Sequence, residues 1–96
     1  MAKIAISGDY RQVIRAARVR LGLSRTTLER VAQLGQAYVK GVESGRKQRT
    51  ESATLTRLLN ALQQQAEQAQ VPAKMKAGLL RAVKRVEKQG EKAAKR

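Results

Sequence analysis

The sequence predicts an all-α fold, a small bundle of five helices, and three observations favour this class. The chain has 96 residues, which is enough for one small domain. It contains two tyrosines but no phenylalanine or tryptophan, so its core must be built from Leu, Val, Ile and Ala. A core of this kind suits a helical bundle better than a β-sandwich. Apolar residues also recur at helical spacing in five separate stretches.

The first of these stretches follows an N-terminal arm, residues 1–8. Within the arm, Ile4 and Ile6 alternate with polar or small residues, and they either make a short strand or stay disordered. Asp9 is a good N-cap for the first helix, which is expected to end just before Gly22.

Two short amphipathic stretches come next and are joined by a tight turn. The first is expected from about Ser24, a good N-cap, to Ala32. The second is expected from Gln36 to Ser44, with Gly45 as its stop. Each helix is too short to be stable alone in water. Two such helices, braced by neighbours, are typical of a helix-turn-helix, whose second helix fits the DNA major groove.

A fourth helix is predicted to begin near Thr50 or Glu51. Its apolar face carries Leu55, Leu58, Leu59 and Leu62. Over residues 63–70, either this helix continues in weakened form or a linker begins. Pro72 is well placed to open a fifth helix that ends at Gly90. The chain is thus expected to contain an arm (1–8), a helix-turn-helix domain (9–66), a basic C-terminal helix (71–90) and a frayed tail (91–96).

Between residues 15 and 45 the chain resembles the Cro/C1-type (Xre-like) helix-turn-helix family, without a gap. The matching residues are Arg15, Arg18, Gly22, Leu23, Ser24, Leu28, Val39, Val42, Glu43 and Gly45. The chain departs from the family at Glu29, where the family has a small residue, and at Gln33, where it has glycine. The resemblance implies a lambda-repressor-like fold and a sequence-specific transcriptional regulator. Such regulators are most often repressors that bind an inverted-repeat operator as homodimers, and small ones resemble those of phages and plasmids.

The net charge of +14 is extreme for a chain of this size. High charge keeps a small protein soluble, but an excess of one sign along the whole chain favours nucleic-acid binding. An anionic membrane surface fits less well, because the basic stretches lack large apolar anchors. No apolar run reaches the length of a membrane span, and the start lacks the features of a signal peptide. A cytoplasmic protein that binds double-stranded DNA is therefore expected.

The residues that usually carry out catalysis are scarce. The chain has no cysteine and no histidine, which removes disulfides, thiolate metal sites and the commonest general base. No pair of carboxylates suggests an acid–base site. We therefore expect neither an enzyme nor a bound metal or cofactor.

Base contacts are predicted in the N-terminal part of the helix expected over residues 36–44. The candidates are Gln36, Ala37, Lys40 and Gly41. Glutamine can bond adenine, alanine can touch the methyl group of thymine, and lysine can reach guanine or a phosphate. The glycine would allow close approach to DNA.

Phosphate contacts are predicted around that helix. The candidates are Arg25, Tyr38, Ser44, Arg46, Lys47 and Arg49. Arg25 lies at a helix start, where backbone amides also favour phosphate. Tyr38 has an alternative, which is to pack beside the preceding helix.

An ion pair is predicted between Arg18 and Glu43. Both residues lie on the expected buried faces of their helices, and a buried charge needs a partner. Such a pair would join the first helix to the end of the third, and the family has a pair at these two positions. The alternative is that both side chains extend to water.

The last helix has an apolar stripe and a basic back. The stripe consists of Met75, Leu79, Val83 and Val86. It either packs on the fourth helix or joins two subunits, and we predict a homodimer interface. The basic back can add phosphate contacts.

Two other functions are compatible with this sequence. One is an antitoxin-type protein that covers a small protein partner and also represses its own operon. The other is an architectural protein that reads only the charge and shape of DNA.

Overall fold

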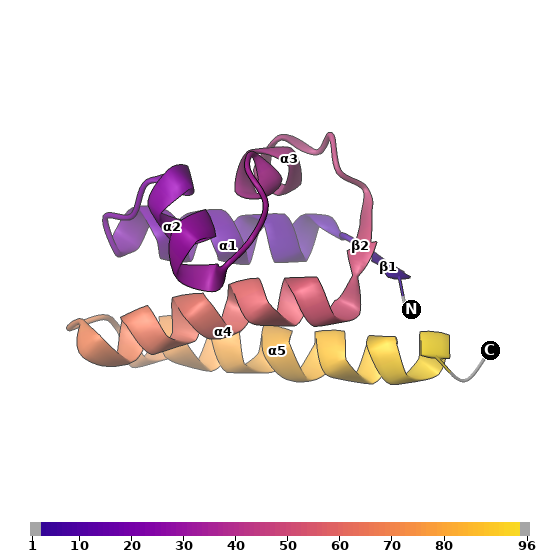
Figure 1. Cartoon of the computed structure of the whole chain (residues 1–96). Coiled ribbons are helices and arrows are strands. Elements are labelled where there is room, and N and C mark those ends of the chain that lie inside the picture. Colours follow the sequence, from indigo (N-terminus) through magenta and orange to yellow (C-terminus); the bar gives the residue numbers. More distant parts are fainter. Residues whose placement is uncertain (1–2, 95–96) are drawn as a thin grey trace.

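The computed structural model describes residues 3–94, which form five helices and one two-stranded ribbon (Figure 1). The elements are β1 (Lys3–Ala5), α1 (Gly8–Arg20), α2 (Arg25–Ala32), α3 (Tyr38–Ser44), β2 (Arg49–Glu51), α4 (Ser52–Gln68) and α5 (Ala73–Ala94). The predicted all-α class is confirmed, with the short ribbon as an addition. Of the two alternatives for residues 63–70, the helix continues, because α4 extends to Gln68.

The helices form two groups. The two longest, α4 and α5, lie side by side, and the chain reverses direction between them (Figure 1). The three shorter helices α1, α2 and α3 lie on the other side of α4 in the same view, with α3 farthest from α5. The interior between the groups is aliphatic apart from Tyr10, as composition predicts. Its largest fully buried side chains are Tyr10, Ile14, Leu28, Val39, Val42, Leu55, Leu58, Leu59, Leu62, Leu79 and Val86.

The N-terminal arm forms a strand instead of remaining disordered. β1 pairs antiparallel with β2, and Ile4 lies opposite Thr50. Ile4 and Ile6 are both buried, and the backbone N–H of Ile6 donates to the carbonyl oxygen of Gln48 at 2.9 Å. Because β2 uses the residues expected to open the fourth helix, α4 begins at Ser52.

The start of α1 differs from the prediction. Ser7, with extended backbone, is the N-cap, and Asp9 lies inside the first turn. The helix begins this early because Ile6 is the last residue held by the ribbon. Asp9 still opposes the positive end of the helix, and its carboxylate lies 3.5 Å from the guanidinium of Arg85. Gly22 follows the helix with φ +70°, as expected of a residue that ends it.

Gly90 does not end the last helix. α5 passes through it to Ala94, so the predicted fraying is wrong for residues 91–94, and residues 95–96 lie outside the described part of the chain. Gly90 is buried, and a Cβ atom at this position would lie 2.7 Å from the Cβ of Ser52 in α4. The glycine therefore allows close packing of the two helices.

Two alanine substitutions in α5 should have opposite effects. Gly78 has no atom near the position of a Cβ, so Gly78→Ala should raise the free energy of unfolding by about 0.5–1 kcal/mol. Gly90→Ala should be less stable than Gly78→Ala by about 1–3 kcal/mol, because the new methyl group overlaps Ser52. Urea unfolding followed by circular dichroism measures both. Equal gains in the free energy of unfolding for the two variants would contradict the close packing of Gly90 against Ser52.

The dimer interface predicted on the last helix is wrong. Leu79, Val83 and Val86 are buried in the chain's own core, and Met75 is half-buried against it. Side chains already enclosed by their own chain cannot also face a second subunit. The other alternative holds, since α5 packs on α4.

Candidate nucleic-acid interface

Helix α2 begins and ends at defined caps. Ser24 is its N-cap, and the Ser24 hydroxyl oxygen accepts the backbone N–H of Thr27 at 3.0 Å, which confirms the predicted role. Gln33 follows the helix with φ 57°, in the left-handed conformation. Glycine adopts this conformation freely, whereas a residue with a Cβ adopts it at a cost of about 1 kcal/mol.

Helix α3 is shorter than predicted. It begins at Tyr38, and its N-cap Ala37 has φ 66°. An α-helix cannot continue through a residue in the left-handed conformation, so Gln36 and Ala37 lie in the turn before the helix and not in its first turn. Both remain exposed, at the end of α3 where base contacts were predicted.

Glu29 supplies the cap that Ala37 lacks. It is buried, and its Oε2 accepts the backbone N–H of Val39 at 2.9 Å. This contact satisfies one of the free N–H groups at the start of α3 and places negative charge at its positive end. The sequence marks Glu29 as unusual, because it departs from the family pattern that the chain resembles. Its capping role could be recognised only from its contact with Val39 in the structure.

The other end of α3 is fixed by the predicted ion pair, which is confirmed. Arg18 Nε donates to Glu43 Oε2 at 2.7 Å, and Arg18 Nη2 donates to Glu43 Oε1 at 3.0 Å. Arg18 Nη1 also donates to the carbonyl oxygen of Leu23 at 2.9 Å. The side chain of Glu43 is only 1 % exposed and that of Arg18 is 14 % exposed. This two-point contact joins α3 to α1.

A second arginine reaches the same carboxylate from outside. Arg25 Nε lies 3.4 Å from Glu43 Oε1, and the Arg25 side chain is 44 % exposed. The contact holds Arg25 beside α3, while much of its guanidinium still faces solvent. This is compatible with the phosphate contact predicted for Arg25.

Tyr38 packs inward. Its hydroxyl lies 2.7 Å from Thr50 Oγ1, and burial raises the pKa of this hydroxyl above its usual range, so it stays neutral. The Nζ of Lys47 lies 5.4 Å from the centre of the tyrosine ring. The phosphate contact predicted for Tyr38 is therefore not supported, because the structure uses its hydroxyl internally.

Gly41 faces the loop that follows α3. Its carbonyl oxygen accepts the backbone N–H of Lys47 at 3.0 Å, and a Cβ at position 41 would lie 3.5 Å from the Cβ of Lys47. The missing side chain thus leaves room for the loop. The base contact predicted at Gly41 is not supported by this orientation.

The remaining predicted contact residues lie at the surface around α3. Exposed side chains are those of Gln36, Ala37, Lys40, Ser44, Arg46 and Arg49, and Lys47 is half-buried. The hydroxyl of Ser44 is partly used within the chain, since it lies 3.4 Å from both the Gly41 carbonyl oxygen and the Arg46 backbone nitrogen.

The structure adds two cations to this surface that the sequence did not single out. The guanidinium of Arg11, in α1, approaches Gly45 at the end of α3, at 3.9 Å from the position of a Cβ there. Lys3, in β1, lines a polar pocket of about 210 Å³ together with Lys47 and Arg49. Lys3 reaches this place through the pairing of β1 with β2, which no local sequence pattern indicated.

Of the carboxylates near α3, Glu43 alone forms ion pairs within residues 3–94. Glu29 and Glu43 are held by hydrogen bonds within the protein, and Glu51 lines the pocket beside Lys3. Within residues 3–94, no cluster of His, Cys, Asp or Glu could hold a metal ion. No helix in the described part of the chain is long and apolar enough to cross a membrane.

Comparison with family models, with curated proteins and with solved structures gives no match for this chain.

Proposed function

We propose that the protein is a sequence-specific DNA-binding transcriptional regulator in which α2 and α3 act as a lambda-repressor-like helix-turn-helix. Helix α3 enters the major groove of double-stranded DNA. Repression is the simplest outcome, because a small protein bound at a promoter blocks access to it. A homodimer on an inverted repeat remains part of this proposal, with an interface outside the buried stripe of α5.

One observation carries the proposal: cations from separate stretches of the chain gather around a short helix whose Lys40 and Ser44 side chains are exposed. Arg25 contacts Glu43, Lys47 covers Tyr38, and Arg11 approaches Gly45. These residues come from α2, the loop after α3, and α1. A surface of this kind attracts the phosphates on either side of a groove.

The helix is also held rigidly, as a reading element must be. Glu29 fixes its start, and the Arg18–Glu43 pair fixes its end. Between these anchors, Lys40 projects from the exposed side. We assign Lys40, with Gln36 in the preceding turn, to base edges, and Arg46 and Arg49 to phosphates.

The test starts from a duplex selected for tight binding from a random library, alongside a scrambled duplex. Lys40→Ala should weaken binding to the selected duplex by about 1–3 kcal/mol and leave scrambled binding nearly unchanged. Arg46→Ala should weaken both duplexes equally. Fluorescence anisotropy over a series of salt concentrations measures both affinities.

The salt dependence supplies the control. For the wild type, log K should fall against log salt with a slope of about −0.9 per neutralised phosphate, and Arg46→Ala should reduce the slope by about one phosphate. Arg20→Ala, an exposed arginine at the end of α1, should change little. A flat salt response would exclude nucleic-acid binding. If Lys40→Ala and Arg46→Ala behave alike, α3 does not read the sequence.

Architectural DNA binding is the second candidate, favoured by the shortness of α3. The helix has seven residues, and Lys40 is its only long exposed polar side chain. The same measurements decide, since an architectural protein would bind the selected and scrambled duplexes with nearly equal affinity.

A further inference from the structure

Helix α5 carries a row of cations that the proposed interface does not use. The row consists of Lys74, Arg81, Lys84, Arg85, Lys88 and Lys92, all of them exposed. The positions 74, 81, 85, 88 and 92 are 7, 4, 3 and 4 residues apart, so they share one side of the helix, and Lys84 lies beside them, four residues before Lys88. The opposite side carries Leu79, Val83 and Val86 and is buried.

The helix that carries this row lies at the opposite edge of the molecule from α3. Figure 1 shows α5 at one edge and α3 at the other, with α4 between them. A straight duplex seated on the outer side of α3 is therefore separated from α5 by the body of the protein.

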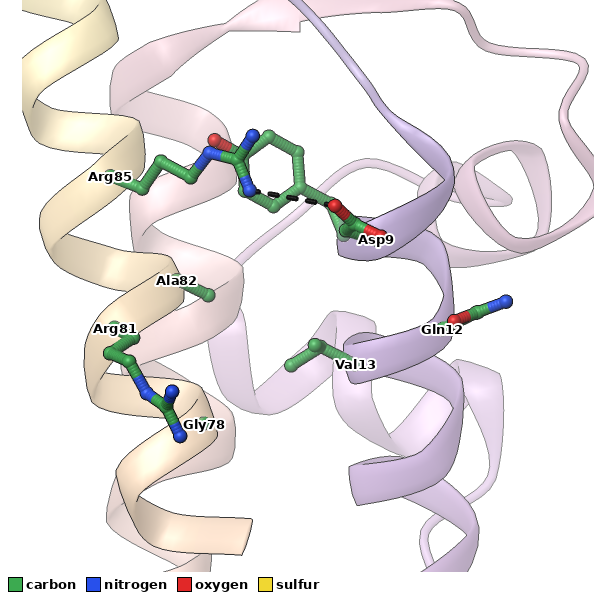
Figure 2. Close-up of a pocket in the computed structure, with 8 residues that line it drawn as sticks. Asp9, Gln12, Val13, Gly78, Arg81, Ala82 and Arg85 are labelled. Atoms are coloured by element: carbon green, nitrogen blue, oxygen red, sulfur yellow. Dashed lines mark ion pairs between the residues drawn. The ribbon is translucent and has the colours of Figure 1, made fainter. Parts of the chain in front are cut away.

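Little of this charge is neutralised within the protein. Among the described residues, Arg85 alone in the row forms an ion pair, with Asp9. Figure 2 shows this contact in a groove of about 450 Å³ between α1 and α5, with Arg81 at the same groove. The guanidinium of Arg85 also lies 5.6 Å from the centre of the Tyr10 ring. Glu87 and Glu91 are exposed on α5, but the helix has seven basic residues against these two acidic ones.

The shape of the row fits a rigid polyanion. At 1.5 Å per residue, Lys74 and Lys92 are about 27 Å apart along a continuous helix. Single-stranded nucleic acid fits less well, since α5 has no aromatic side chain on which bases could stack. A membrane surface also fits less well, because Leu80 is the only large exposed apolar side chain on this helix.

We infer that α5 binds the phosphate backbone of a second DNA duplex, so that one molecule bridges two duplexes. The inference rests on the proposed function, because bridging also needs the surface around α3. The backbone contact involves charge and not base edges, so the second duplex is bound without sequence preference.

The experiment compares two variants with the same change in charge. Lys84→Glu/Lys88→Glu alters the row, and Arg15→Glu/Arg20→Glu alters two exposed arginines on α1. Beads carrying the selected duplex are incubated with protein and a fluorescent duplex of unrelated sequence, and the captured fluorescence is measured. The α5 variant should capture at least about tenfold less fluorescent duplex than the control variant. Anisotropy should show equal binding of both variants to the selected duplex alone.

The remaining outcomes separate the two proposals. Equal capture of the fluorescent duplex by the two variants overturns the role of α5. A dimer that bridges duplexes through its two α3 surfaces would give this result. Failure of the wild type to bind any duplex overturns the proposed function itself. Pelleting with phosphatidylserine vesicles that depends on Lys84 and Lys88, with capture unchanged, would assign the row to membranes. Circular dichroism checks folding, and Lys84→Gln/Lys88→Gln replaces the first variant if it unfolds.

Discussion

Replacing Glu43 with alanine is expected to lower the free energy of unfolding by about 3–5 kcal/mol, because it leaves Arg18 partly buried without its partner. Small domains are stable by about 5–15 kcal/mol in total, so this single change removes a large share. The loss should appear in urea unfolding without any DNA present. DNA binding should weaken as well, since the pair fixes the end of α3.

Two comparisons show whether the buried contact is responsible. Arg25→Ala removes only the outer, more exposed contact to Glu43, and it should cost less than about 1 kcal/mol. The double change Arg18→Leu/Glu43→Leu should recover part of the loss, because it leaves no charge unpaired. An unchanged midpoint of urea unfolding in Glu43→Ala would mean that water already supplies the hydrogen-bond partners of Arg18.

Replacing Leu79 with alanine is expected to cost about 2–5 kcal/mol. Leu79 is fully buried where α5 packs into the core, so the smaller side chain leaves a cavity. By the same reasoning, a chain that ends before α5 should unfold, because it uncovers the core that α5 completes.

The neighbouring residue provides a matched control. Leu80 is 42 % exposed, so Leu80→Ala should cost less than about 1 kcal/mol by the same measurement. Equal losses in the free energy of unfolding for Leu79→Ala and Leu80→Ala would show that α5 does not pack into the core through Leu79. A loss that depends on protein concentration in Leu79→Ala alone would instead restore the subunit interface predicted from sequence.

The interface around α3 could be predicted only in part. Lys40, Arg46 and Arg49 are exposed as expected, because charged residues next to a short amphipathic helix seldom become buried. The contacts predicted for Tyr38 and Gly41 are not supported, since both residues are used by the chain itself, against Thr50 and Lys47. Amino-acid type alone does not distinguish a side chain available to a partner from one engaged internally.

The sequence by itself determined the all-α class and the apolar face of α4, and it predicted the pairing of Arg18 with Glu43 with the support of the family resemblance. The first two follow from local spacing, and the pairing follows from two inward faces. Helical periodicity marks the residues that face inward, and two opposite charges on inward faces of a small domain have few other partners.

Only the tertiary structure decided the β1–β2 ribbon, the late start of α3 at Tyr38, and the role of α5. These depend on residues far apart in the chain: Ile4 opposite Thr50, Glu29 at the N–H of Val39, and Gly90 against Ser52. The apolar stripe on α5 was equally compatible with a second subunit and with the chain's own core. The hydrophobic effect drives burial without choosing the partner, and the packing of α5 against α4, α1 and β1 made that choice.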